Sequence, residues 1–112
     1  MPKYIDLKKE NFDGDRIVLP GRVPGMLLAH AEWCGHCTRF MPTYAELARD
    51  LKCNFYRIGH KDLNEGNLGK TLGIKSFPTL YIVDANGCLE KYNGGREKAD
   101  ILKGLCAAFH KK

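Results

Sequence analysis

A strand that leads directly into an amphipathic helix constrains this chain more than any other feature. Residues 26–31 form a run of mainly small and apolar side chains, as in a strand covered on both faces. From residue 35 to residue 51 apolar side chains recur at intervals of three and four, which predicts a helix with one core-facing stripe. A strand buried on both faces needs helices on both sides of its sheet. An α/β fold follows.

The rest of the chain continues the alternation and then closes with a hairpin. Further strands are expected at residues 4–7, 53–58 and 78–83, with a short helix at 63–72. The segment Asp84-Ala85-Asn86-Gly87 predicts a hairpin turn, because Asn-Gly suits positive φ. The return strand is residues 88–92, and a last helix extends to about residue 109. We predict one domain, residues 1–112, with a central mixed sheet flanked by helices on both faces.

Composition excludes several classes of protein. A chain of 112 residues with 44% hydrophobic and 28% charged residues is typical of one globular domain. Its apolar runs are a handful of residues long, whereas a membrane span needs about 20. The net charge is +5, but the basic residues are scattered among acidic ones. We therefore expect a monomer that binds neither membrane nor nucleic acid.

The chain has five cysteines, an odd number that excludes complete pairing within one chain. Only Cys34 and Cys37 are close in sequence, which favours a reducing compartment with one special pair. Cys106 is expected to be buried on the last helix, while the exposure of Cys53 and Cys88 is left open. The first residues lack the apolar segment of a signal peptide. We expect a cytoplasmic location, or a secretory lumen if the chain is a trimmed piece.

The segment Trp33-Cys34-Gly35-His36-Cys37 stands between the buried strand and its helix. A thiol at a helix N-terminus lies beside unpaired amides and the positive end of the helix dipole, and both favour its thiolate. Cys37 follows one turn later, close enough to form a small disulfide ring. A protonated His36 would add a cation. We expect Cys34 to be the nucleophile and Cys37 the resolving thiol.

Three other uses of a Cys-x-x-Cys pair fit less well. Zinc needs a second ligand pair, and the remaining cysteines and histidines show no matching spacing. A c-type haem needs a histidine where Thr38 stands. Two inert, buried thiols would not be expected beside the Gly35-His36 pair. We expect no metal and no organic cofactor.

Three segments of the chain resemble the thioredoxin superfamily, and within it the protein disulfide isomerase domains. They are Ala31–Cys37 with Pro42 downstream, Gly73–Leu80 and Tyr92–Glu97. The Cys-Gly-His-Cys core is that of isomerase domains, whereas thioredoxins usually carry proline where His36 stands. The segments occur in the family's order and, with the elements between them, cover almost the whole chain. The resemblance implies a thioredoxin-like fold.

The resemblance also implies a substrate site around the cysteines. The Phe77–Pro78 bond would be cis and face Cys34, which leaves the backbone of Phe77 free to pair with an extended substrate. Trp33 and Gly35 would contact the same substrate, Trp33 as an apolar platform. Arg96 matches an arginine thought to approach the resolving thiol and lower its pKa. The alternatives are a proline that merely begins a strand and a solvated arginine.

The strand before the motif departs from the family. The family commonly buries a carboxylate there, which carries a proton to or from the resolving cysteine, and Leu28 stands in its place. His30 lies two residues further, on the same face of the strand. It is either a substitute proton carrier or a hydrogen-bonded spectator.

These observations predict a thiol–disulfide oxidoreductase that forms, reduces or isomerises disulfides in proteins, as protein disulfide isomerase does. Its partners would be protein thiols and disulfides, with glutathione or a disulfide reductase as electron partner. One alternative is an intracellular, thioredoxin-like disulfide reductase. The other is a peptide-binding module with little turnover.

Overall fold

The computed structural model describes residues 4–19 and 24–109, and a five-stranded mixed sheet forms its centre. In spatial order the strands are β1 (Tyr4–Asp6), β5 (Asn54–Gly59), β4 (Gly25–His30), β6 (Thr79–Val83) and β7 (Leu89–Tyr92). The first three are parallel, while β6 is antiparallel to β4 and β7 to β6. A short turn of 3-10 helix (Lys9–Asn11) precedes a separate two-stranded sheet of β2 (Phe12–Asp13) and β3 (Arg16–Ile17), and a bridge between Arg16 and Cys88 connects β3 to the segment before β7.

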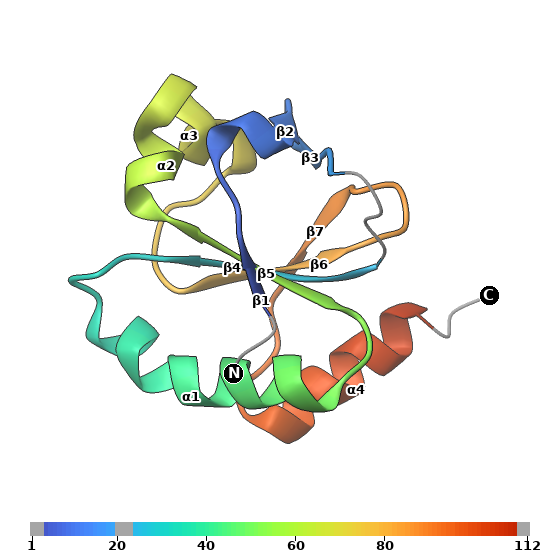
Figure 1. The fold of residues 1–112 in the computed structure, drawn as a ribbon. Coiled ribbons are helices and arrows are strands. Elements are labelled where there is room, and N and C mark those ends of the chain that lie inside the picture. Colours follow the sequence, from blue (N-terminus) through green and yellow to red (C-terminus); the bar gives the residue numbers. More distant parts are fainter. Residues whose placement is uncertain (1–3, 20–23, 110–112) are drawn as a thin grey trace.

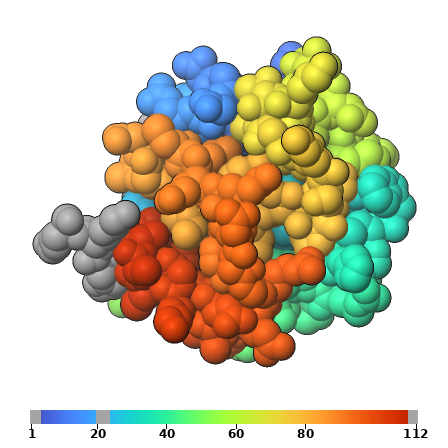
Figure 2. All heavy atoms as spheres, turned by 180° about the vertical axis from the view of Figure 1, so that it is seen from behind, coloured from blue at the N-terminus to red at the C-terminus, as the bar shows by residue number. Residues whose placement is uncertain are grey.

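Helices cover both faces of this sheet (Figure 1). One face carries α1 (Gly35–Asp50) and α4 (Lys98–Phe109). The other carries the short helices α2 (His60–Asn64) and α3 (Leu68–Leu72). Viewed from behind, β7 crosses the middle of the surface and α4 lies below it (Figure 2). The predicted thioredoxin-like arrangement, a mixed sheet between helices, is confirmed.

Strand β4 belongs to two hydrophobic cores because its side chains alternate between the faces of the sheet. Met26 and Leu28 pack with α1 and α4, whereas Leu27 and Ala29 pack with α2 and α3. All four are 0% exposed, as expected for a central strand. The hydroxyl of Tyr44 on α1 lies 3.0 Å and 2.6 Å from carbonyl oxygens of β4 and β5. These contacts fix α1, and with it the Cys34–Cys37 segment, against the sheet.

The helix predicted at residues 63–72 is broken in two. Between α2 and α3 the backbone of Gly66 (φ 57°) and Asn67 (φ 60°) is left-handed, within a 3-10 turn over Glu65–Asn67. Glycine and asparagine are the residues that adopt this conformation at least cost, so the two helices can meet at an angle.

The predicted hairpin turn is present, with a different cause from the one expected. Only Gly87 has positive φ (84°) among residues 84–88, while Asn86 does not. The carboxylate of Asp84 accepts hydrogen bonds from the backbone N–H groups of Asn86 at 2.8 Å and Cys88 at 2.9 Å. An aspartate that binds the backbone of its own turn is a common turn-forming device. Asp84 and Gly87 therefore make the turn together.

An ion-pair cluster joins the two helices on the α1 face. Lys98 lies 2.7 Å from Glu46 and 2.8 Å from Asp50, and Arg49 lies 2.9 Å from Asp50. The hydrogen bond from Arg49, followed by that from Lys98, lowers the pKa of Asp50 to about 2. A carboxyl group with a lowered pKa stabilises the fold above its unfolded pKa of about 3.9, and this contribution is lost as the pH falls towards 2.

We therefore expect Asp50→Asn to lower the melting temperature at pH 7 by at most a few degrees. The difference from the wild type should shrink between about pH 4 and pH 2, because there the wild-type carboxyl becomes protonated. Thermal unfolding followed by circular dichroism across this range measures it. Glu90→Gln is the matched control, since Glu90 makes no ion pair within the described residues. A pH-independent difference would show that the ion pairs do not cause it.

Candidate active site

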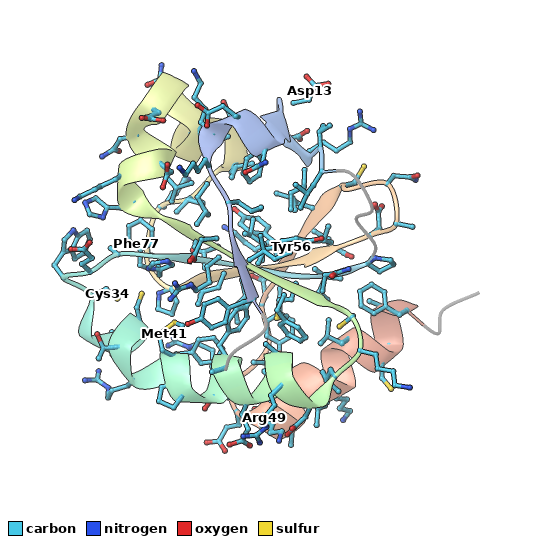
Figure 3. All side chains as sticks on the ribbon, in the orientation of Figure 1. Asp13, Cys34, Met41, Arg49, Tyr56 and Phe77 are labelled. Carbon is cyan, nitrogen blue, oxygen red and sulfur yellow. The ribbon has the colours of Figure 1, made fainter. Side chains whose placement is uncertain are left out.

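Cys34 caps the N-terminus of α1 with its thiol. Its Sγ accepts a hydrogen bond from the backbone N–H of Cys37 at 3.2 Å and lies 3.5 Å from the carbonyl oxygen of Phe77. Figure 3 shows Cys34 where α1 begins, on the side of Phe77. The hydrogen bond with the Cys37 thiol is the largest of several effects that lower the pKa of Cys34. The backbone amides of Cys37 and His36 and the charge of Arg96 also lower it.

Cys37 has the opposite environment. It is 2% exposed, packed with Ala31, Cys34 and Phe77. Burial, followed by the hydrogen bond with Cys34, raises its pKa to about 11. The two thiols therefore differ as a nucleophile and a resolving thiol should: one favours its thiolate and the other keeps its proton. Cys34 is 7% exposed, so it is the more accessible residue of the pair.

An apolar platform lies beside Cys34. The indole of Trp33 is 70% exposed, and it packs edge-on against Phe77 with 5.6 Å between ring centroids. The ring of His60 also packs edge-on against the indole, with 5.9 Å between ring centroids. The Phe77–Pro78 peptide bond is cis. Trp33 and Phe77 thus meet next to the Cys34 sulfur although they stand far apart in the sequence.

His36 contacts Arg39, a residue that was not among the site residues predicted from the sequence. The guanidinium of Arg39 lies 2.9 Å from Nδ1 of His36. A guanidinium can only donate, so Nδ1 of His36 is the acceptor in this contact. The spacing of three residues on a helix is the signal that could have indicated the pair.

Arg96 supplies positive charge to the cysteines. It lies just before α4 and lines a hollow of about 210 Å³ with His36, Arg39 and residues of α1. Its charge lowers the pKa of both Cys34 and Cys37, although for each thiol it is the smallest of the named effects. Gly35 begins α1 and is exposed.

An apolar side chain, Leu28, occupies the position where the family commonly buries a carboxylate. Leu28 is 0% exposed beneath α1, and its partner in the sheet register is Arg57 on β5. Arg57 is paired with Asp6 through two hydrogen bonds, at 2.7 Å and 3.0 Å, and lies over the ring of Tyr4. His30 is half-buried, and burial followed by the charge of Arg57 lowers its pKa. A neutral imidazole at pH 7 could accept a proton.

The remaining cysteines lie away from this site. Cys106 is exposed, so the expectation that it is buried was wrong: the last turns of α4 bury Leu105 and turn Cys106 outward. Cys88 is exposed and Cys53 is half-buried. Within residues 4–19 and 24–109 there is no group of three or more His, Cys, Asp or Glu that could hold a metal ion. The helices of the same residues include none that is long and apolar enough to cross a membrane.

A mixed sheet between helices, with a Cys-x-x-Cys pair at the start of α1, defines a thioredoxin domain. The family described as Thioredoxin matches residues 3–107, and the chain belongs to this family. Protein disulfide-isomerase erp38 of Neurospora crassa is 38% identical over 109 residues, which are 92% of this chain and 28% of that protein. Probable protein disulfide-isomerase A4 of Caenorhabditis elegans is 34% identical over 104 residues, 90% of this chain and 16% of that protein. The resemblance read from the three segments is confirmed.

Solved structures give the same result. Thioredoxin f from spinach chloroplast (short form) has a TM-score of 0.73 at 27% identity, with 96% of this chain and 95% of that chain covered. The first thioredoxin domain of mouse Protein disulfide-isomerase A4 has a TM-score of 0.69 at 25% identity, with 89% and 71% covered. The chain therefore matches both a thioredoxin and an isomerase domain in fold.

The expectation of a cytoplasmic location is contradicted. The curated relatives are protein disulfide-isomerases of the endoplasmic reticulum lumen. The expectation rested on the residues with which this sequence begins, and that argument is unsound here. The chain spans only 28% and 16% of the two isomerases described above, so its first residues carry no information about location.

Proposed function

We propose that this domain is a thiol–disulfide oxidoreductase of the protein disulfide isomerase type, acting on the thiols and disulfides of proteins. One observation carries the proposal: the Cys34 sulfur accepts the Cys37 amide at the start of α1, and the two thiols have opposite pKa shifts. The relatives that are named protein disulfide-isomerases support it. Neither a metal nor an organic cofactor takes part.

The reaction is an exchange of disulfide bonds. The Cys34 thiolate attacks one sulfur of a substrate disulfide, and the substrate S–S bond breaks as the mixed disulfide forms. The released substrate thiolate takes a proton. Cys37 then loses its proton and attacks the Cys34 sulfur, which releases the second substrate thiol. Two electrons have moved to the substrate, and the domain holds the Cys34–Cys37 disulfide. In reverse, this disulfide oxidises two substrate thiols.

The residues around the cysteines bind and position the substrate. An extended substrate segment pairs with the backbone of Phe77 ahead of Pro78, and it replaces the contact of the Cys34 thiol with the Phe77 carbonyl. Trp33 and Gly35 lie along this segment. Arg96 favours the Cys37 thiolate when resolution begins. His36, at the N-terminus of α1, tunes the stability of the Cys34 thiolate.

The electron partner is glutathione or a disulfide reductase, since the exchange stops when all of the domain is oxidised or all reduced. The domain acts as a monomer, because attack by one sulfur and resolution by the other are completed within a single pair of cysteines. Neither a nucleic acid nor a membrane is part of the reaction.

The reduction potential is the measurement that tests the proposal. Thiolate stabilisation in the reduced form makes a disulfide more oxidising, and reference values are about −270 mV for thioredoxin and about −180 mV for the isomerase. We expect a value of roughly −240 to −190 mV by equilibration with glutathione. His36→Pro should make the potential more negative. A wild-type value at or below that of thioredoxin would instead support the reductase alternative.

A further inference from the structure

A hollow adjoins the active site on the side of α2 and α3. It has a volume of about 500 Å³, and Trp33 and Phe77 form its edge towards Cys34. Leu63 and Ile74 contribute further apolar surface. Asn67, where the chain breaks between α2 and α3, also lines the hollow. A substrate bound across Trp33 and Phe77 would therefore have this hollow directly beside it.

The charged side chains that line the hollow are positive. Lys70 on α3 and Lys75 after it both line the hollow, as does His60, and no carboxylate is among the lining residues. The acids nearest in sequence, Glu32, Asp62 and Glu65, stand outside the lining. Both lysines are exposed. Neither forms an ion pair with the described acids, in contrast to Lys98 on α4.

The opposite flank of the substrate position is also basic. On the far side of Pro78 a second hollow, of about 210 Å³, is lined by Lys91 and Arg96, again without a carboxylate. An extended segment paired with Phe77 would pass between two basic surfaces. Uncompensated cations beside an apolar edge attract anionic groups and raise the rate of encounter with them.

We propose that the hollow between Trp33, Phe77 and α3 is a specificity subsite for an acidic side chain of the substrate, next to the cysteine that Cys34 attacks. Lys70 and Lys75 bind the carboxylate, while Leu63 and Ile74 contact its aliphatic stem. The preferred substrates are protein disulfides flanked by Asp or Glu. This inference rests on the proposed function and names the substrate class for the same site.

The test uses three peptide disulfides of equal length whose cysteine is flanked by Glu, by Gln or by Lys. Glu and Gln have the same shape, so their comparison isolates charge. The reduced protein is mixed with each peptide in a stopped-flow instrument, and the second-order rate constant for reduction is measured. Each constant is divided by that for dithiothreitol and the same peptide, because a flanking carboxylate also changes the reactivity of the disulfide itself.

We expect the normalised rate for the Glu peptide to exceed that for the Gln peptide about fivefold, the size expected of two exposed ion pairs. The Lys peptide should react most slowly. In Lys70→Gln/Lys75→Gln the Glu-to-Gln ratio should fall to about one, and 0.5 M NaCl should reduce it in the wild type. Lys103→Gln on α4, which removes one exposed charge outside the hollow, should keep the wild-type ratio.

Two outcomes would overturn the inference, and they differ from failure of the proposed function. A wild-type ratio of one would show that the domain ignores flanking charge. An unchanged high ratio in the double variant would place the acidic preference elsewhere. If the reduced protein reacts with all three peptides no faster than dithiothreitol, the oxidoreductase function itself fails, and the substrate class fails with it.

Discussion

Replacing Cys34 with serine is expected to reduce the catalysed reduction of insulin to the uncatalysed background. A serine hydroxyl at the start of α1 could still accept the Cys37 amide, so the fold should persist, but it cannot attack a disulfide. Insulin turbidity in the presence of dithiothreitol measures the loss. Cys106→Ser is the matched control, because Cys106 is exposed on α4 and lies outside the site. Cys37→Ala should still attack substrates, but it should accumulate mixed disulfides.

The same assignment predicts which thiol is alkylated first. Cys88 and Cys106 are the more exposed thiols, whereas Cys34 is 7% exposed but has a lowered pKa. Because the thiolate is the reactive form, iodoacetamide near neutral pH should modify Cys34 before the others. Peptide mapping by mass spectrometry gives the order. Earlier modification of Cys37, or insulin reduction by Cys34→Ser, would refute the assignment of the nucleophile.

The main elements of the fold could be predicted because their signals are local. The apolar run at residues 26–31 and the stripe on residues 35–51 appear as β4 and α1 with their ends moved by about one residue. The helix at residues 63–72 was not predicted correctly, because Gly66 and Asn67 inside that range adopt left-handed backbone and divide it into α2 and α3. Cys106 was misplaced because it lies beside the apolar stripe of α4: Ile101, Leu105 and Phe109 face the core at intervals of four, and Cys106 points away from them.

The site could be predicted only as far as its motif extends. The positions of Cys34 and Cys37 follow from a helix N-terminus and one turn of spacing. The contact of Trp33 with Phe77 crosses 44 positions of the chain, and without the family resemblance no local pattern indicates it. The Arg39–His36 hydrogen bond and the pairing of Arg57 with Asp6 depend on side-chain choices between several possible partners. Those choices are made in the folded chain.

Leu28→Glu is expected to have the largest effect on stability. It should also change the rate at which Cys37 resolves the mixed disulfide. Leu28 is 0% exposed in the core beneath α1, so the change removes apolar packing and buries a carboxyl group. A loss of roughly 3 kcal/mol or more in the free energy of unfolding follows, measured by urea denaturation. Arg57, its register partner, is already paired with Asp6 and compensates only in part.

The introduced carboxylate should nevertheless accelerate resolution. Cys37 must lose a proton before it attacks the mixed disulfide. In the reduced domain burial, followed by the hydrogen bond with Cys34, raises its pKa to about 11, and the burial persists when Cys34 is bound to substrate. A carboxylate at position 28 would give this proton an acceptor on the strand beneath α1. Stopped-flow measurement of the decay of the mixed disulfide should show faster resolution in Leu28→Glu than in the wild type. Leu28→Gln has the same shape without a base, and it should show the loss of stability alone.

In the wild type this proton has to leave by another route, and two variants distinguish the candidates. Arg96 favours the Cys37 thiolate by charge, so Arg96→Ala should prolong the mixed disulfide and raise the pKa of both cysteines. His30 has a lowered pKa and could accept the proton itself. If His30→Ala slows resolution while Arg96→Ala does not, His30 is the proton carrier. If proton removal limits resolution, the added base in Leu28→Glu should make it resolve faster than Leu28→Gln. Equal rates in the two variants would show that proton removal is not limiting.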